Sequence, residues 1–229
     1  LRLKYRLGLF DDPMTRIKDY PDFASEEHSL AARETAIEGA ILLKNEGDIL
    51  PLKQGTKILV TGPNANSMRS LNGGWTVTWQ GKLNPGELDS HNTILEAMRE
   101  RFGAGNVSYV PGVLYDETGD YRAELTPDFD AVTRAAAAAD VIVACIGENS
   151  YCETPGNIDD ITISPNQAQL VRVAAATGKP VVFILNEGRA RVISEIEPLA
   201  RAVVDILLPG NEGGNALAAL LSGDANFSG

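Results

Sequence analysis

Two glutamates, Glu148 and Glu153, lie in a short stretch, residues 147–157, that follows the apolar run 141–146. Such a run predicts a buried strand, and an α/β protein usually places its chemistry after the carboxyl end of a strand. Glycosidases need one carboxyl group that protonates the leaving oxygen and another that acts as nucleophile or base. The stretch could therefore supply half of such a site, although an arbitrary loop glutamate is more often a solvated charge or a cap.

Both tryptophans of the chain, Trp75 and Trp79, lie between glycines in the stretch 73–81, which reads Gly-Gly-Trp-Thr-Val-Thr-Trp-Gln-Gly. Flat aromatic faces stack on the apolar faces of pyranose rings, and glycines let a backbone present such faces closely. The same rings could instead pack into the core and anchor a long loop. The sequence alone favours neither interpretation.

Three other polar stretches favour structural roles. The pair Asp159 and Asp160 matches no calcium loop, so it indicates caps or surface charge. The stretch 186–189, Asn-Glu-Gly-Arg, favours an ion pair within that loop or between domains. The glycine-rich stretch 209–215 lacks the Gly-Lys-Ser/Thr of a P-loop and the G-x-G-x-x-G pattern, so it favours a tight turn over a nucleotide site.

Composition narrows the class of protein further. The net charge of −11 argues against a nucleic-acid partner and fits a neutral ligand such as a sugar. No apolar run is long enough to span a membrane. The isolated histidines His28 and His91 suggest no metal site, and no cofactor is indicated. Cys145 and Cys152 are expected to be free thiols, because a strand residue rarely points at its own following loop.

Most of the chain alternates between predicted strands and helices. A helix is predicted from the N-cap Ser25, and a short extended piece at 42–45 follows it. Strand-like runs then alternate with amphipathic patterns, which indicates an α/β fold whose mostly parallel sheet is covered on both faces. The predicted strands are 57–61, 107–110, 141–146, 180–185 and 202–208, and the predicted helices are 93–102, 128–139, 167–177 and 214–221.

In a sheet of this kind the ligand site lies beyond the carboxyl ends of the strands. Four loops leave those ends, and they contain the unusual residues described above. These loops are 62–80, 147–157, 186–189 and 209–215. We therefore expect them to converge on one site. Residues 1–23 show no sustained period and indicate a linker or tail, and the abrupt ends of the chain lead us to expect a fragment of a larger protein.

A set of short motifs runs in one order along nearly the whole chain. The motifs are at 6–10, 32–34 leading to 41–45, 50–52, 73–75 to 79–81, 147–151 to 153, and 208–210 to 223–224. Together they resemble glycoside hydrolase family 3, the β-glucosidases and exo-glucanases. The sequence departs from the family pattern at Ala190, where proline is common, and at Cys152, where threonine is common.

The resemblance implies a three-layer α/β/α sandwich at residues 24–229, cut short at its C-terminus, that is the second domain of a larger enzyme. Residues 1–23 correspond to the end of an N-terminal (β/α)8 barrel domain and the interdomain linker. The nucleophile of this family is an aspartate in a Ser-Asp-Trp-like motif on the barrel. This chain has no such motif, so the isolated chain is expected to be inactive.

The resemblance also assigns roles to individual residues. Glu153 corresponds to the general acid/base and Glu148 to a supporting acid, while Trp79 and Trp75 correspond to the aromatic clamp around the sugar beyond the cleaved bond. The implied reaction is retaining, exo-acting hydrolysis of β-glucans or cello-oligosaccharides from the non-reducing end, in a periplasmic or secreted protein. The alternatives are a non-catalytic carbohydrate-binding or interdomain scaffold module and, third, a flavodoxin-like nucleotide binder.

Overall fold

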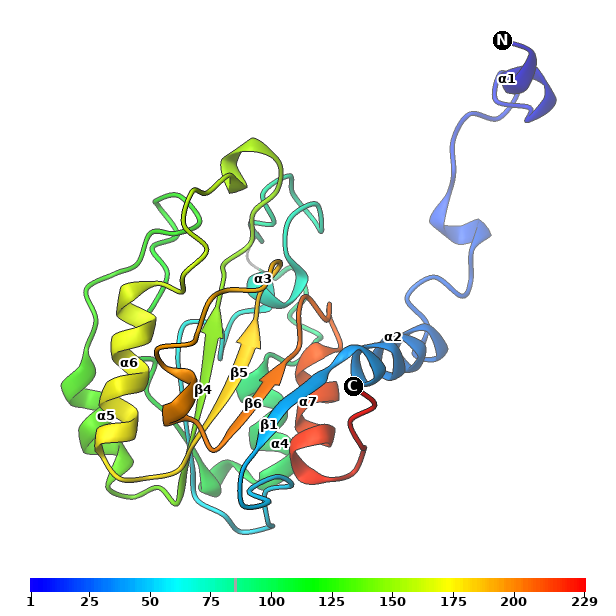
Figure 1. Cartoon of the computed structure of the whole chain (residues 1–229). Helices are drawn as coiled ribbons and strands as arrows, with labels where there is room; N and C mark the ends of the chain where they lie inside the picture. The colour runs from blue at the N-terminus through cyan, green and yellow to red at the C-terminus, as the bar shows by residue number, and fades with distance from the viewer. Residues whose placement is uncertain (85) are drawn as a thin grey trace.

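The structure, a computed structural model, describes residues 1–84 and 86–229. Within these residues, six strands form one sheet in the order β1-β6-β5-β4-β2-β3 (Figure 1). All neighbouring pairs are parallel except the edge pair β1 and β6, which is antiparallel. The strands are β1 (Ile41–Asn45), β2 (Ile58–Thr61), β3 (Val107–Tyr109), β4 (Val141–Gly147), β5 (Val181–Asn186) and β6 (Ala202–Asp205).

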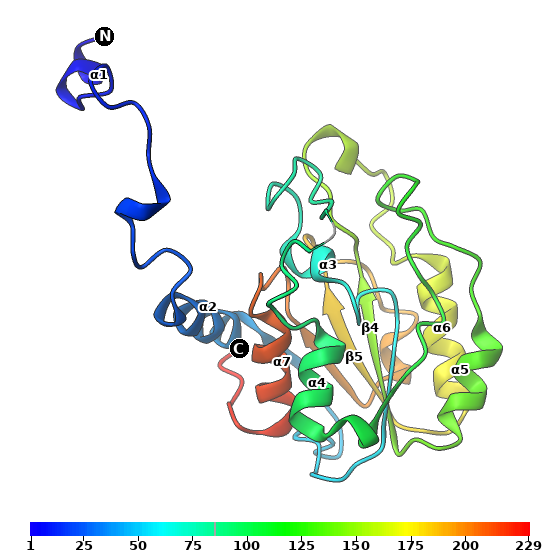
Figure 2. The same ribbon diagram turned by 180° about the vertical axis from the view of Figure 1, so that it is seen from behind.

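Helices cover both faces of this sheet (Figures 1 and 2). The helices are α1 (Arg2–Arg6), α2 (Glu26–Gly39), α3 (Met68–Asn72), α4 (Ile94–Phe102), α5 (Phe129–Ala136), α6 (Pro165–Ala176) and α7 (Gly213–Ser222). Alternate strand residues feed two separate cores: Val143 joins the cluster under α4 and α7, and Ile142 joins the cluster under α5 and α6. The predicted three-layer α/β/α sandwich with a mostly parallel sheet is therefore confirmed.

Local sequence signals explain where the helices begin. Ser25, Thr93 and Asp128 each accept a hydrogen bond from a backbone N–H in the first turn of α2, α4 and α5. Thr93 forms a full capping box with Glu96. Ser164, however, gives α6 no side-chain cap, because its hydroxyl donates to a carboxylate oxygen of Glu124 instead.

The structure adds elements that the sequence does not predict, among them the short helix α1 within residues 1–23, and it moves several boundaries. The extended piece 42–45 is part of the edge strand β1, α3 was not predicted, and β6 ends at Asp205 rather than at residue 208. The strand ends there because Leu207 has a φ of 50° and its N–H donates to Asp205 Oδ1. A residue with positive φ cannot continue a strand.

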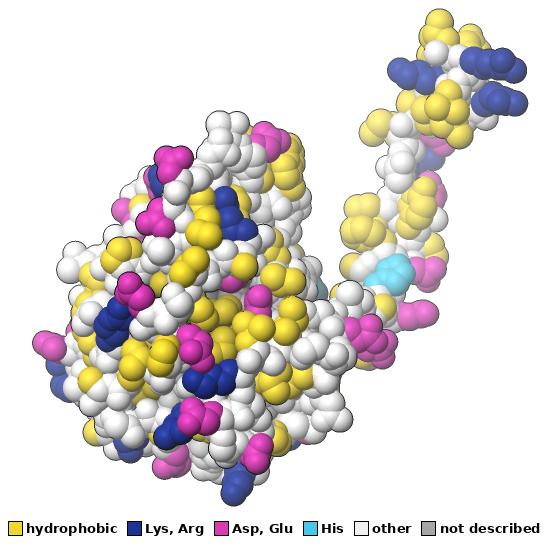
Figure 3. Space-filling view, viewed as in Figure 1, with side chains coloured by type: hydrophobic (Ala, Val, Ile, Leu, Met, Phe, Trp, Pro, Cys, Tyr) yellow, Lys and Arg dark blue, Asp and Glu magenta, His cyan; other side chains and the backbone are white. Residues whose placement is uncertain are grey.

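The first 24 residues extend away from the sandwich (Figures 1 and 2). Large apolar side chains are exposed along this segment, for example Tyr5, Ile17 and Phe23, and basic side chains gather near its free end (Figure 3). No described helix is both long enough and apolar enough to cross a membrane.

Candidate active site

Buried asparagines tie three loops together at the carboxyl edge of the sheet. Asn64, after β2, donates from Nδ2 to the carbonyl of Glu148 at 2.9 Å and to Oδ1 of Asn186 at 3.0 Å. Asn186 in turn donates to the carbonyl of Leu207 at 2.7 Å. Tyr115 completes the group by donating its hydroxyl to Asn64 Oδ1 at 2.8 Å. The loops that follow β2, β4 and β5, and the chain after β6, therefore meet at one edge, as the sequence predicts.

Glu148 points into the protein and is surrounded by donors. Its Oε2 accepts hydrogen bonds from the Tyr151 hydroxyl at 2.9 Å and from the Gly188 N–H at 3.0 Å. Its Oε1 accepts from Arg191 Nε at 2.9 Å and lies 3.3 Å from Arg189 Nε. Only 4% of the residue is exposed. These contacts make Glu148 the centre of a buried ion-pair network that joins the loops after β4 and β5.

Arg189 holds the 147–157 loop from inside. Its Nε donates to the Tyr151 hydroxyl at 2.6 Å, its Nη2 donates to the Gly156 carbonyl at 2.6 Å, and its guanidinium carbon lies 4.2 Å from the centre of the Tyr151 ring. Arg191 holds the segment that follows this loop, because its guanidinium donates to the carbonyls of Asp160 and Thr162. Arg189 thus pairs with the neighbouring loop, not with Glu187 of its own loop.

Glu187 is a second buried carboxyl group beside this network. Its Oε1 accepts from the Arg191 N–H at 3.0 Å, while its Oε2 has no hydrogen-bond partner among the described residues. Burial raises the pKa of Glu187 to about 7, and the nearby carboxylates of Asp205 and Glu148 contribute to the same shift. Glu187 is therefore partly protonated near neutral pH, where an ordinary exposed glutamate is ionised.

Glu153 differs from Glu148 in exposure, in hydrogen bonding and in backbone conformation. It is exposed, and no other described residue donates a hydrogen bond to its carboxylate. Its backbone has φ 54° and ψ −150°, a region that is essentially restricted to glycine. The strained residue precedes the short 3-10 turn Thr154–Gly156. Strain of this kind persists only where the surroundings impose it, and it is concentrated at functional sites.

The two tryptophans are exposed, Trp75 to 65% and Trp79 to 48%, so the interpretation that they pack into the core is wrong. Their loop is joined to the loop of Glu153 at Cys152. The Cys152 thiol donates to the carbonyl of Trp79 at 2.8 Å, and the Gln80 side chain bonds both the N–H and the carbonyl of Cys152. Trp79 and Glu153 are therefore held on adjoining loops.

Glycines permit this close approach. A Cβ atom at Gly74 would lie 2.5 Å from the Tyr151 carbonyl oxygen, and one at Gly81 would lie 2.8 Å from Ser150 Cβ. The sequence suggested that these glycines expose the aromatic rings to a ligand. The structure adds that they allow two loops to pack backbone to backbone.

Two buried arginines of the site, Arg191 and Arg69, are not indicated by the sequence. Arg191 is described above, and Arg69 of α3 donates from Nε to Ser150 Oγ at 2.6 Å and is only 8% exposed. Both bond to residues far away in the sequence, so no local pattern marks them. The burial of an arginine becomes visible only when its partner is known.

The remaining predictions for this edge concern structural residues. Asp160 accepts from the Thr162 N–H at 2.8 Å, as expected of a turn residue. The 209–215 stretch is a turn closed by the hydrogen bond from the Gly213 N–H to the Gly210 carbonyl. Both cysteines are free, as predicted. Among the described residues, no cluster of His, Cys, Asp and Glu could hold a metal ion.

Comparisons with known proteins identify relatives of the whole chain. The family model "Glycosyl hydrolase family 3 C-terminal domain" matches residues 40–229. A lysosomal beta glucosidase of Dictyostelium discoideum is 36% identical over 100% of this chain and 28% of its own length. A periplasmic beta-glucosidase of Salmonella typhimurium is 33% identical over 100% of this chain and 32% of its own length. The chain thus spans about a third of the length of these relatives.

Solved structures agree with these matches. A mutant beta-glucosidase from Listeria innocua, in complex with laminaribiose, is 31% identical and superposes with a TM-score of 0.80. The match covers 99% of this chain and 29% of that chain. The same enzyme in complex with glucose gives a TM-score of 0.79 at 30% identity.

Proposed function

Because the chain belongs to glycoside hydrolase family 3 and matches its C-terminal domain, we propose that it supplies the general acid/base of a retaining, exo-acting β-glucosidase. In this proposal Glu153 is the acid/base, and the nucleophilic aspartate lies on a (β/α)8 barrel domain that precedes residue 24. The substrates are β-glucans or cello-oligosaccharides, which lose terminal β-D-glucosyl residues. Relatives in complex with laminaribiose and glucose support this substrate class.

The contrast between the two glutamates of the 147–157 loop carries the proposal. All the hydrogen-bonding capacity of Glu148 is directed inward, so its carboxylate cannot reach a substrate without breaking a buried ion-pair network. Glu153 is exposed, strained and without a side-chain hydrogen bond to any other described residue. Of the two glutamates in this loop, Glu153 is therefore the one whose carboxyl group is available, and Glu148 supports it by fixing the loop.

A retaining glycosidase places its two carboxyl groups roughly 5–5.5 Å apart. In the first step Glu153 protonates the departing oxygen while the barrel aspartate attacks the sugar and forms the glycosyl-enzyme. In the second step the carboxylate of Glu153 activates the water that releases the sugar. Trp79, with Trp75, stacks on the sugar beyond the cleaved bond. The Cys152 thiol donates to the Trp79 carbonyl, so the loop that carries Trp79 stays beside the loop that carries Glu153.

The decisive experiment uses an enzyme that joins the barrel domain to this chain. A Glu153→Gln variant should lose about 10²- to 10⁴-fold in kcat on substrates with poor leaving groups. It should lose far less on activated aryl glucosides, and azide should restore part of the turnover. Glu195→Gln, at a residue whose side chain is 85% exposed, is the matched control. Near-normal hydrolysis of cellobiose by the Glu153→Gln variant would remove Glu153 from this role.

The tryptophans require a separate test. Trp79→Ala should raise KM for cello-oligosaccharides longer than cellobiose more than it lowers kcat, because stacking beyond the cleaved bond is lost. Trp75→Ala tests the second ring in the same way. Equal kinetics across chain lengths would show that neither exposed ring contacts the sugar.

The exposed tryptophan pair also fits the alternative, a non-catalytic carbohydrate-binding or interdomain scaffold module. Calorimetric titration of the chain with cellotriose separates the two proposals, since tight binding by the chain alone favours the binding module. For location we propose the periplasm or secretion. One matched relative is named periplasmic and another lysosomal, and fractionation of the producing cells tests this.

A further inference from the structure

The side chain of Gln80 bridges the tryptophan loop and the loop of Glu153. Its Nε2 donates to the Cys152 carbonyl at 3.1 Å, and its Oε1 accepts from the Cys152 N–H at 3.2 Å. One amide group therefore bonds both backbone polar groups of a single residue, as a residue of a neighbouring antiparallel strand does. Cys152 directly precedes Glu153 in the chain, so the bridge reaches the backbone beside the proposed acid/base.

Gln80 is itself held through its backbone. Ser150 Oγ donates to the Gln80 carbonyl at 2.7 Å, and Arg69 Nε donates to the same Ser150 oxygen at 2.6 Å. Ser150 and Arg69 are buried, with 2% and 8% of their surfaces exposed. The amide of Gln80 therefore extends from a buried, hydrogen-bonded base, and its two bonds can fix the position of Cys152.

Glu153 lies between this bridge and a second anchor. On its C-terminal side the Gly156 N–H donates to the Glu153 carbonyl at 2.9 Å, and the Gly156 carbonyl accepts from Arg189 Nη2 at 2.6 Å. The backbone of Glu153, with φ 54° and ψ −150°, is unfavourable for a residue with a side chain and persists only where its surroundings impose it. The hydrogen bonds on both sides of Glu153 impose this conformation.

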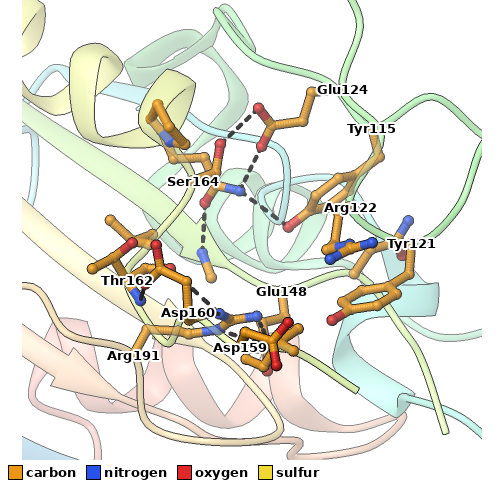
Figure 4. A pocket seen from close by; sticks show the side chains of 16 residues that line it. Tyr115, Tyr121, Arg122, Glu124, Glu148, Asp159, Asp160, Thr162, Ser164 and Arg191 are labelled. Atoms are coloured by element: carbon orange, nitrogen blue, oxygen red, sulfur yellow. Dashed lines mark hydrogen bonds and ion pairs between the residues drawn. The ribbon is translucent and has the colours of Figure 1, made fainter. Parts of the chain in front are cut away.

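Other contacts of the loop act further from Glu153. Glu148 pairs with Arg191 at the start of the loop (Figure 4). Within the part of the chain that the structure describes, only the Gln80 side chain forms hydrogen bonds with the backbone of Cys152. Removing this one amide therefore releases the backbone just before Glu153 and leaves the pair of Glu148 and Arg191 intact.

We propose that Gln80 is a positioning residue for the acid/base: its amide fixes the backbone of Cys152 and thereby directs the carboxyl group of Glu153. The chemical role of Gln80 rests on the proposed function, whereas its geometry rests on the bonds to Cys152. Gln80 contacts no reacting atom. Since a misplacement of about 1 Å can cost about 10²-fold in rate, loss of the amide should impair proton transfer although the carboxyl group remains.

The first test measures amide hydrogen exchange in the full chain. Gln80→Met keeps the length of the side chain but removes both bonds to Cys152, so exchange at the Cys152 N–H should rise about two- to tenfold, the range expected for one hydrogen bond. Gln169→Met, at an exposed position of α6, is the matched control and should leave this exchange unchanged. Unchanged exchange in Gln80→Met would overturn the proposal, whatever Glu153 does in catalysis.

The second test uses the enzyme that joins the barrel domain to this chain. Gln80→Met should lower kcat/KM about 10- to 100-fold on methyl β-D-glucoside, whose poor leaving group needs a proton and has no ring for Trp79 to stack on. On a dinitrophenyl β-D-glucoside, whose leaving group needs no proton, kcat/KM should change less than about twofold. Equal losses on both substrates would mean that Gln80 only supports the fold. A loss on cellobiose with normal hydrolysis of the methyl glucoside would mean that it serves Trp79 instead.

Gln80→Asn repeats both tests with a side chain that stays polar. Its amide is one methylene group shorter and cannot bond both groups of Cys152 from the same backbone position. It should therefore show the same rise in exchange and the same dependence on the leaving group. Wild-type behaviour of Gln80→Asn in both tests would contradict the requirement for the bridge.

A double variant shows whether Gln80 acts through Glu153. If it does, Gln80→Met combined with Glu153→Gln should be as active on methyl β-D-glucoside as Glu153→Gln alone, within about twofold. Losses that multiply would refute the positioning role and leave the acid/base assignment in place. Normal hydrolysis by Glu153→Gln alone would instead refute the proposed function, and with it the chemical role of Gln80.

Discussion

Arg189 stacks on Tyr151 and also bonds to it: the guanidinium lies 4.2 Å from the ring centre and its Nε donates to the hydroxyl at 2.6 Å. The hydroxyl in turn donates to the buried Glu148 at 2.9 Å. The chain of contacts runs from an arginine after β5, through an aromatic ring, to a carboxylate directly after β4. It fixes the inner side of the loop that exposes Glu153.

Arg189→Ala should therefore loosen this loop. The variant loses a charge-assisted hydrogen bond of about 1.5–3 kcal/mol and a cation–π contact of about 0.5–2 kcal/mol. We expect the free energy of unfolding to fall by about 2–4 kcal/mol and amide hydrogen exchange to rise at residues 150–157. Arg189→Lys should restore less than half of this, because one ammonium cannot bond Tyr151 and Gly156 in the same planar geometry.

Arg172→Ala is the matched control for that measurement. Arg172 pairs with Glu195, whose side chain is 85% exposed, so its removal should cost no more than about 0.5 kcal/mol in urea unfolding. If both alanine variants unfold at the same urea concentration, the contacts of Arg189 do not hold the loop.

Replacing each of the two glutamates of the loop should have a different effect on the free energy of unfolding. Glu148→Gln leaves Arg191, whose side chain is 8% exposed, without its charged partner, and breaking a buried pair costs about 3–5 kcal/mol. Glu153→Gln changes an exposed group and should stay within about 0.5 kcal/mol of the wild type. Chemical denaturation of the two variants measures both effects. Similar stability of the two would contradict the structural role assigned to Glu148.

The sequence predicts the fold well because its signals are local. Apolar β-branched runs identify the parallel strands, and Ser25 and Thr93 mark helix starts within a few residues. The antiparallel pairing of β1 with β6 cannot be predicted in this way. This pairing joins Ile41 to Asp205, and nothing near either residue reveals the other.

The sequence predicts only part of the site, because many of its contacts join residues that are far apart in the sequence. Glu153 and Trp79 receive their expected roles from the resemblance to the family, because a loop glutamate alone is more often a solvated charge. The support for them comes from Arg69 and Arg191, which bond to Ser150 and Glu148 across long stretches of sequence. The strain at Glu153 is a property of the folded loop, so residue type alone cannot show it.

Gly74→Ala should disturb the junction between the tryptophan loop and the Glu153 loop. The new Cβ would lie 2.5 Å from the Tyr151 carbonyl oxygen and 2.8 Å from Cys152 Cβ, so the two loops must separate. Overpacking of this kind costs about 1–3 kcal/mol. Thermal unfolding, together with the fluorescence emission of the tryptophans, detects both the loss of stability and the movement. Gly105→Ala, where no heavy atom lies within 4 Å, should change neither.

The buried Glu187 makes stability depend on pH. Its pKa is raised to about 7, so the folded chain holds this proton more tightly than the unfolded chain. The stabilisation is complete below the unfolded pKa of about 4.3 and is lost as the pH rises through 7. The raised pKa of Asp205, also caused by burial, acts in the same direction.

Glu187→Gln should remove most of this dependence. Between pH 5 and pH 8 the wild type should lose about 2 kcal/mol more than the variant, since one pKa unit corresponds to about 1.4 kcal/mol. Urea unfolding at both pH values measures the difference, and the exposed Glu195→Gln is the control. Parallel pH profiles for Glu187→Gln and the wild type would show that Glu187 ionises normally in the fold.

Glu153→Gly should stabilise the protein while it slows hydrolysis of substrates with poor leaving groups by the proposed enzyme that joins the barrel to this chain. The φ of 54° and ψ of −150° at Glu153 cost about 1–3 kcal/mol in a residue with a side chain. Glycine relieves this strain but loses about 0.5–1 kcal/mol more in backbone entropy. The net gain in the free energy of unfolding should be about 1 kcal/mol, and Glu153→Gln, which keeps the strain, should show none.

Asp48→Gly is the control for this last comparison, because Asp48 also has a positive φ, 51°, in an exposed turn. It should leave hydrolysis unchanged. A gain in stability with a loss of activity, confined to Glu153, would mean that the fold holds this residue in an unfavourable conformation because the chemistry requires its carboxyl group there. A loss of stability in Glu153→Gly would mean instead that the side chain itself anchors the loop.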